Sequence, residues 1–196
     1  MVLVYAILLL IIIALLLRRD LSLIGRIAYR GGWKFIGVII GLFILQATLV
    51  LYTPGQNRLQ MALLISSQLA LIGLILLNHQ LPGAKIFALG IALNLVVMLA
   101  NGGWMPVTPE TYHFVHPDRE VPLYARPADS KNIILPRSET RLWFLSDLIR
   151  VALPGRRNAV SPGDVLLIIG AAQFIFQTTA KKERPVPGGR AIEEKL

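Results

Sequence analysis

Residues 93–110 read LNLVVMLANGGWMPVTPE, and a long hydrophobic segment ends within this stretch. Gly102 and Gly103 follow the last apolar turn, where a helix C-cap needs a positive φ that glycine adopts freely. Trp104 then falls at the level where aromatic side chains meet lipid headgroups. The two prolines that follow, beginning with Pro106, keep the helix from resuming. The stretch predicts a membrane helix that ends in a capped, polar exit.

The composition of the chain also indicates a membrane protein. Of its 196 residues 55% are hydrophobic, above the ~45–50% of soluble domains, and the excess is gathered in blocks. The net charge is +9, from 20 Lys and Arg against 11 Asp and Glu. Because basic residues flank the apolar blocks, we interpret them as topology signals and lipid contacts, and we expect no binding to nucleic acid. The absence of cysteine excludes disulfides and thiolate chemistry.

Five apolar blocks predict an all-α integral membrane protein with five transmembrane helices. The blocks are residues 2–17, 35–52, 59–77, 84–100 and 165–180. Each is slightly shorter than the ~20 residues of a typical span, so flanking aromatic and basic side chains complete the crossing. The chain divides accordingly into four spans, an outer loop, a fifth span and a basic tail, with boundaries at 1–100, 101–163, 164–180 and 181–196.

The distribution of Lys and Arg predicts the orientation in the cell membrane. The connection after the first block and the C-terminal tail are the most basic of the short segments. With five spans and an outer N-terminus, both lie in the cytoplasm, which satisfies the positive-inside rule. The loop of residues 101–163 is then outside, where a loop of this length translocates with little regard to charge.

Small and amide residues on the predicted spans indicate helix packing. Gly37 and Gly41 form a GxxxG motif, which packs either within the chain or in a homodimer. Asn94 and Asn101 share one face of the fourth block, and Gln173 lies in the fifth. No block has an ionisable residue in its middle, which argues against proton-coupled transport. Such amide faces suit hydrogen bonds between helices, or a neutral ligand such as a quinone or lipid.

The outer loop carries two local signals. Residues 138–152, SETRLWFLSDLIRVA, have apolar side chains on one half of a helical wheel, which predicts an amphipathic helix in the membrane interface. On its polar half Asp147 and Arg150 are spaced to pair. Ser161, followed by proline and then Asp164, predicts a capping box that opens the fifth span.

We expect the outer loop to fold over the ends of the fourth and fifth spans and to form the working surface. The predicted ligand- or partner-binding residues are Asn94, Asn101, Gly102, Gly103, Trp104, Met105, Asp147, Arg150, Asp164 and Gln173. No metal site is predicted, because the His113-x-x-His116 pair lies on a proline-broken segment that does not fix its spacing. The sequence names no cofactor, and no nucleotide-binding or hydrolase motif is present.

The elements NGGWMPV, DSKNIILP, FLSDLI and SPGDVLLIIGAAQFIFQ resemble those of a family of small multi-pass bacterial membrane proteins known only as a domain of unknown function. The resemblance covers about residues 90–177. It implies importance for one set of residues, which comprises Asn94, Asn101, Gly102, Gly103, Met105, Pro106, Lys131, Asp147, Ser161, Gly163 and Asp164. It supports the topology and the outer loop and implies no activity.

Three functions remain open from the sequence. The first is a non-enzymatic accessory or assembly subunit of a larger membrane complex, with the bilayer and other membrane subunits as partners. The second is a small permease or lipid- or quinone-binding protein that uses the amide-lined face between the fourth and fifth spans. The third is an outer-leaflet enzyme, which needs at least two of Asp147, Asp164, His113 and His116 to converge.

Overall fold

The computed structural model describes residues 2–52, 55–127, 130–153 and 155–179, and the predicted cytoplasmic tail lies outside these residues. The long helices are α1 (Val2–Leu16), α2 (Gly32–Tyr52), α3 (Arg58–Leu77), α4 (Ala84–Ala100) and α6 (Pro162–Thr178). The shorter elements are η1 (Leu21–Arg26), β1 (Met105–Val107), α5 (Pro109–Val115), β2 (Asn132–Ile134), η2 (Arg137–Glu139), η3 (Trp143–Leu145), β3 (Ile149–Leu153) and β4 (Arg156–Val160). The fold is thus mostly helical, with a few short strands.

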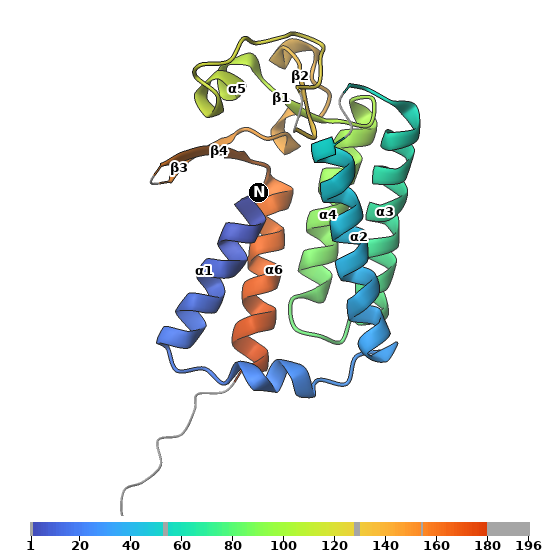
Figure 1. The fold of residues 1–196 in the computed structure, drawn as a ribbon, viewed down its shortest axis with the longest axis vertical. Helices are drawn as coiled ribbons and strands as arrows, with labels where there is room; N and C mark the ends of the chain where they lie inside the picture. Colours follow the sequence, from blue (N-terminus) through green and yellow to red (C-terminus); the bar gives the residue numbers. More distant parts are fainter. Residues whose placement is uncertain (1, 53–54, 128–129, 154, 180–196) are drawn as a thin grey trace, which may run out of the picture.

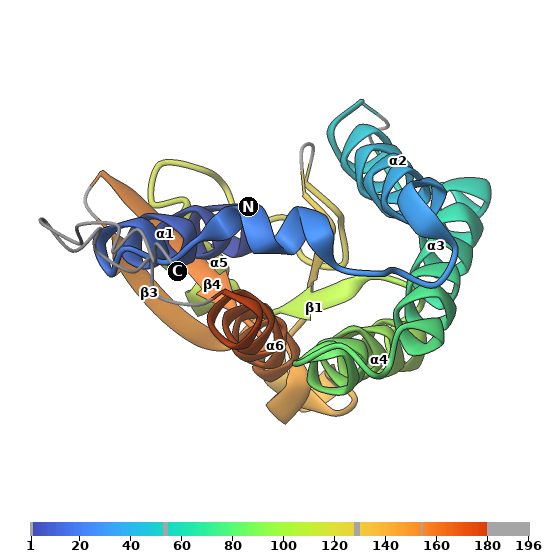
Figure 2. The ribbon, with the colours of Figure 1, turned by 90° about the horizontal axis from the view of Figure 1, so that it is seen from below.

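The long helices stand side by side, and the segment between α4 and α6 forms a cap over one end of them (Figure 1). Seen along their axes, they form an open arc in the order α1, α6, α4, α3, α2 (Figure 2). α1 packs on α6, and α2 packs on α3, so these two helices are the ends of the arc. Two helices, α2 and α3, are long and apolar enough to cross a membrane, whereas α1, α4 and α6 are apolar but shorter.

The end of the arc opposite the cap is fixed by hydrogen bonds to helix termini. The Arg19 guanidinium donates to the carbonyl oxygens of Phe176 and Thr179, where α6 ends. A cation is favourable there because the free carbonyls of a helix C-terminus carry partial negative charge. Asn78, which follows α3, accepts from the backbone N–H of Arg30 at 2.8 Å. These bonds join α1 to α6, and the segment before α2 to α3.

The cap has a small core of its own and is docked on α3 and α4. β1 and β2 pair in parallel, with Met105 opposite Asn132. The cap core contains Val107, Tyr112 and Ile134. Two further clusters dock the cap, one of Trp104 and Ile133 with Leu64 of α3, and one of Met105 with Val97 and Met98 of α4. The cap is therefore held in a fixed position by burial of apolar side chains.

The amphipathic helix predicted for residues 138–152 is wrong. That stretch contains η2, η3 and the strand β3, which pairs antiparallel with β4, Ile149 opposite Val160. Leu142 has φ +52°, a conformation that interrupts a helix. The structure also buries Asp147, which a helix would have placed on its polar face, and exposes Phe144. The apolar positions therefore serve a hairpin and a docking turn rather than one helix face.

Candidate functional site

The most polar buried region lies where the cap meets the N-terminus of α6. Ser161 and Asp164 form the predicted capping box: the Asp164 backbone N–H donates to Ser161 Oγ at 3.0 Å, and the Ser161 N–H donates to Asp164 Oδ2 at 3.3 Å. Asn94 of α4 completes a ring, because its Nδ2 donates to Asp164 Oδ1 and its Oδ1 accepts from Ser161 Oγ, both at 2.8 Å. The start of α6 is therefore bonded to the side of α4.

This region is recessed below the end of α4. Asn94 lies six residues before Ala100, which is ~9 Å at the 1.5 Å rise of an α-helix. The carboxylate of Asp164, which Asn94 contacts, therefore lies within the helix layer. Lys131 of the cap interacts with it electrostatically.

Glycines bring α4 and α6 into backbone contact. A Cβ at Gly90 would lie 2.7 Å from the carbonyl oxygen of Gly163, and a Cβ at Gly170 would lie 2.9 Å from that of Gly83. The two helices thus touch at two levels, separated by two turns of α6. At these two levels the backbones leave no space for a ligand between α4 and α6.

The cap contributes a cation and a second carboxylate to the region. Lys131 immediately precedes β2, and its carbonyl oxygen accepts from the Met105 N–H of β1. Asp147 follows η3, and its own N–H donates to the carbonyl oxygen of Pro106. Its Oδ2 accepts from Asn132 Nδ2 at 2.6 Å. Both charged side chains are thus positioned by the β1–β2 pair.

Lys131 interacts electrostatically with both carboxylates, Asp147 and Asp164. Burial by itself lowers the pKa of a lysine, but the two carboxylates outweigh it, and the pKa of Lys131 is raised. Asp147 is 4% exposed, and burial raises its pKa even though Lys131 opposes the change. Its Oδ1 has no hydrogen-bond partner among the described residues. Asp147 is therefore a side chain able to hold a proton inside the cap. We call Asn94, Lys131, Asp147 and Asp164 the buried charge network, in which Asn94 and Asp147 are buried and Lys131 and Asp164 are half-buried.

Asn101 and the glycines after it join α4 to the cap. Asn101 Nδ2 donates to the carbonyl oxygens of Val97 and Arg141 at 2.8 Å, and its Oδ1 accepts from the Arg141 N–H. Gly102 and Gly103 have φ of +75° and +90°, as a glycine C-cap requires. Asn101 is thus a bridge between helix and cap.

Two other predicted residues near this exit are buried. Met105 is fully buried between α4 and the cap. Trp104 is 3% exposed, under the guanidinium of Arg126 at 4.8 Å. The expectation that Trp104 faces lipid headgroups is therefore wrong, since it fills the joint between the cap and α3.

The remaining predicted residues lie elsewhere. Arg150 does not pair with Asp147: its Nε donates to Thr111 Oγ1 at 3.2 Å, on the outer part of the cap. Gln173 lies beside Gly83, at the other end of α4. The enzyme alternative requires convergent acid–base groups, and the structure brings Asp147 and Asp164 to one lysine. Both are engaged in hydrogen bonds, and neither lines the two pockets described for the molecule.

His113 belongs to α5, and His116 follows it with its ring 5.0 Å from that of Tyr112. Within the described ranges, no three His, Cys, Asp or Glu side chains gather as they would around a metal ion.

Sequence reasoning missed Lys131 and Asn132 as partners of the carboxylates. The resemblance implied that Lys131 is important, but no local pattern in the sequence indicated its interaction with Asp147 and Asp164. One signal was present: Lys131 directly precedes the apolar run NIIL, and a lysine beside a buried strand needs a counter-charge.

The fold and the site define a mostly helical protein with apolar helices long enough to cross a membrane and a polar cap at one end. The chain belongs to the family of unknown function DUF5317, whose profile matches residues 26–176. This agrees with the resemblance to an uncharacterised family. The chain is 36% identical over 100 residues to an uncharacterized protein of Thermotoga maritima. These 100 residues are 50% of this chain and 52% of that protein. The match thus spans about half the length of this curated relative. No solved structure matches the chain.

Proposed function

We propose that the protein is a five-span integral membrane protein and a non-enzymatic accessory or assembly subunit of a larger membrane complex. Its N-terminus and cap lie outside, and its C-terminus lies in the cytoplasm. The observation that carries this proposal is a helix-packing face on α2 that no other described residue of the chain covers.

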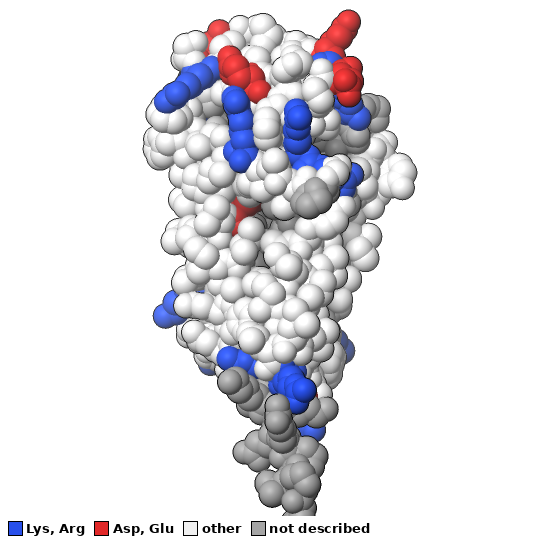
Figure 3. Space-filling view, turned by 90° about the vertical axis from the view of Figure 1, so that its left-hand side faces the viewer, with Lys and Arg blue, Asp and Glu red and all other residues white. Residues whose placement is uncertain are grey.

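The distribution of charge supports the membrane embedding. Figure 3 shows basic side chains at the two ends of the molecule, acidic ones on the cap, and between them a waist of uncharged surface with one small acidic patch. α2 has 21 residues, which gives ~31 Å of helix against the ~30 Å of a bilayer core. Large apolar side chains are exposed along all the long helices, which is favourable in lipid and unfavourable in water.

One face of α2 packs on α3. Phe35 is buried, and Gln46 Nε2 donates to Ser67 Oγ of α3 at 3.0 Å. Ile39 and Leu42 pack on the apolar cluster between the helices. These positions follow one another at spacings of four and three, as in a helix seam.

The opposite face of α2 has a second seam. Gly37, Gly41, Ile44 and Thr48 are spaced by 4, 3 and 4 residues, and all are exposed. At ~100° per residue, this seam points about 180° away from the one that packs on α3. A Cβ at either glycine would meet no atom within 4 Å. Among the residues that the structure describes, this GxxxG motif therefore has no packing partner.

A glycine seam in a membrane helix allows a second helix to approach closely. Lipid chains are as apolar as leucine, so association depends on close backbone approach, which small residues permit. α2 is at the end of the arc, where no other helix of the described chain obstructs this face. A transmembrane helix of another subunit fits these requirements.

The test compares the wild type with the Gly37→Leu/Gly41→Leu double variant and the matched control Ala47→Leu. Ala47 is exposed on the same helix, about 90° from the glycine seam. Recovery of partner proteins from native membranes in mild detergent should be lost in the double variant and kept in the control, at equal melting temperature. Recovery of the wild type as a monomer with lipid alone, or only as copies of itself, would refute the subunit role.

The topology has its own test in reporter fusions. Fusions after Gly55 and after Pro127 should report outside, and a fusion after Gly83 should report inside. A cytoplasmic signal from Pro127 would overturn the orientation.

A further inference from the structure

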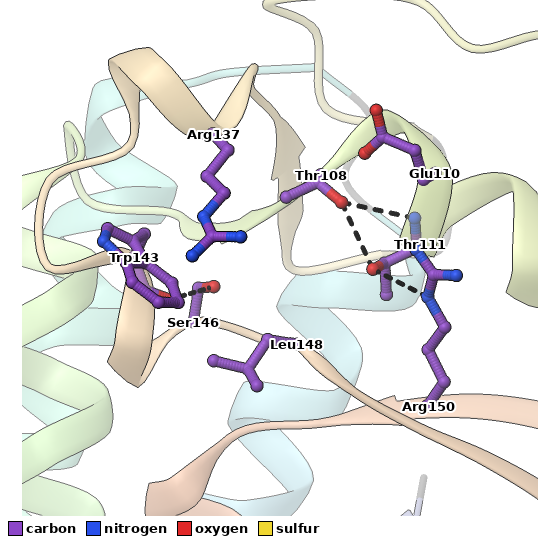
Figure 4. A pocket seen from close by; sticks show the side chains of 8 residues that line it. All are labelled: Thr108, Glu110, Thr111, Arg137, Trp143, Ser146, Leu148 and Arg150. Atoms are coloured by element: carbon purple, nitrogen blue, oxygen red, sulfur yellow. Dashed lines mark hydrogen bonds between the residues drawn. The ribbon is translucent and has the colours of Figure 1, made fainter.

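A pocket of about 680 Å³ opens in the cap, away from the buried charge network. It lies between α5, the η2–η3 segment and the start of β3, and Figure 4 shows its lining side chains. Two arginines enter from different elements: Arg137 extends from η2, and Arg150 rises from β3 toward Thr111. Trp143 and Leu148 supply apolar wall. The pocket therefore combines two cations with an apolar surface.

Both guanidinium groups are held in place by contacts within the cap, and both have N–H groups available to bind a ligand. Arg137 stacks on the Trp143 ring, 3.7 Å from its centroid, which fixes the plane of the cation. In the part of the chain that the structure describes, the N–H groups of Arg137 make no hydrogen bond. Arg150 uses Nε for Thr111 Oγ1, so its two terminal nitrogens remain available for another partner. Free guanidinium N–H groups bind phosphate and carboxylate oxygens strongly, through paired charged hydrogen bonds.

A single acidic residue, Glu110, also lines the pocket. Hydrogen bonds from its own backbone N–H and from Thr108 lower the pKa of Glu110, and Arg150 contributes, so the side chain is ionised at neutral pH. Two arginines and one glutamate leave one net positive charge. This balance suits a monoanion and disfavours a dianion. Glu110 can accept a hydrogen bond from a hydroxyl or ammonium group attached to that anion.

The surroundings of the pocket favour a membrane lipid as the source of the anion. Phe144 and Ile149, which adjoin lining residues in the chain, and Leu153 at the end of β3 are exposed, and Trp143 is 42% exposed. The β3–β4 hairpin lies across the N-terminal end of α1 (Figure 1), and Arg156 donates to the Tyr5 hydroxyl there at 2.6 Å. Aromatic and basic side chains at a helix end are typical of the headgroup level of a bilayer.

We propose that this pocket binds the phosphodiester headgroup of an outer-leaflet phospholipid whose headgroup carries a hydroxyl or amine. The phosphate lies between Arg137 and Arg150, and the headgroup substituent lies toward Glu110. The acyl chains leave along the apolar side chains next to the hairpin. The inference rests on the membrane embedding proposed above, and it does not depend on the helix partner of α2.

The test is phosphatidylglycerol binding to the full chain in mild detergent, followed by native mass spectrometry and by the melting temperature. Wild type should retain one phosphatidylglycerol, and the Arg137→Gln/Arg150→Gln double variant should bind it at least tenfold more weakly. Arg58→Gln is the control, since Arg58 is exposed at the same end of the molecule and does not line the pocket. Equal affinity in wild type and double variant would overturn the proposal.

Two further measurements test the role of Glu110 and distinguish a lipid headgroup from free phosphate. Glu110→Gln should bind phosphatidic acid, a dianion, about threefold more tightly than wild type, because a screened like charge is removed; a misfolded protein cannot show this gain. Inorganic phosphate tests the source of the anion: if it raises the melting temperature and no lipid is retained, the pocket binds free phosphate and the lipid proposal is wrong. The glycine-seam variant of α2 should keep its lipid, and the arginine variants should keep their protein partner, so failure of either proposal is distinguishable.

Discussion

Replacing Lys131 with methionine removes the cation of the buried charge network and keeps the length of the side chain. Asp147, at 4% exposed, would keep the side-chain hydrogen bond from Asn132 and would face the charge of Asp164 without the lysine that offsets it. Lys131 is half-buried and interacts with the carboxylates electrostatically, so its removal should cost more than the ~0–1 kcal/mol of an exposed ion pair and less than the ~3–5 kcal/mol of a fully buried one. We therefore expect Lys131→Met to lower the free energy of unfolding by ~1–3 kcal/mol, or the melting temperature by roughly 2–12 °C.

A second substitution distinguishes electrostatics from packing. In the Lys131→Met background, Asp147→Asn removes the uncompensated carboxylate, so the double variant should be more stable than Lys131→Met alone. Interaction energies between groups in one network commonly reach ~0.5–3 kcal/mol, and this range is the expected rescue. The amide oxygen that the substitution introduces can still accept the hydrogen bond from Asn132.

The measurement is denaturant-induced unfolding in detergent micelles, followed by tryptophan fluorescence. Trp104 packs on Ile133, two residues from Lys131, so its emission reports on the relevant part of the cap. Lys85→Met is the control, because Lys85 is an exposed lysine at the opposite end of α4. If Lys131→Met changes stability by less than ~0.5 kcal/mol, as an ordinary surface substitution does, Lys131 is not electrostatically coupled to the two carboxylates and the reasoning is refuted.

Two more predictions concern the same region. Gly163→Ala should cost ~1–3 kcal/mol in an unfolding experiment, because its Cβ would overlap the amide of Asn94, whereas Gly73→Ala, with nothing within 4 Å, should cost nothing; equal effects would mean that α4 and α6 are not in close contact. Because burial raises the folded pKa of Asp147 above the ~3.9 of the unfolded chain, its stabilising protonated form is lost as pH rises through the folded value. Melting temperatures measured from pH 4 upward should therefore fall less steeply in Asp147→Asn than in wild type, and identical slopes would exclude Asp147 as the titrating group.

Features set by neighbouring residues were predictable from the sequence. The Ser161 and Asp164 capping box needs only residues three apart, and the structure contains it. The positive φ of Gly102 and Gly103 is a property of the helix end itself. The same logic applies to Thr108, which caps α5 with proline at the first helical position. That signal has the same form as the one at Ser161, yet we interpreted this proline only as a helix stop.

Features that depend on distant residues were not predictable. Asn94 and Asp164 are 70 residues apart, and nothing local to either indicates the other. The stretch around Asp147 has apolar residues that fit a helical wheel, but the same residues also fit a turn followed by the alternating strand β3. Which of these two structures forms depends on residues elsewhere in the chain: β4 pairs with β3, and Lys131 interacts with Asp147. The sequence pattern of one segment does not show which charged residues other segments bring next to it.

The recessed start of α6 has a consequence for the order in which the molecule is completed. A chain is synthesised from its N-terminus, so α1 to α4 and the whole cap emerge before α6. Until α6 arrives, Asn94 has no bond to Ser161 or Asp164, and the ammonium of Lys131 has only Asp147 to neutralise it. The contacts of Asn94 and Lys131 with α6 can form only when the last helix is in place. A chain that stops short of residue 161 therefore leaves the amide of Asn94 without its partners on α6 and Lys131 without one of its two carboxylates, which is a physical difference by which membrane quality-control proteases can distinguish it from a finished protein.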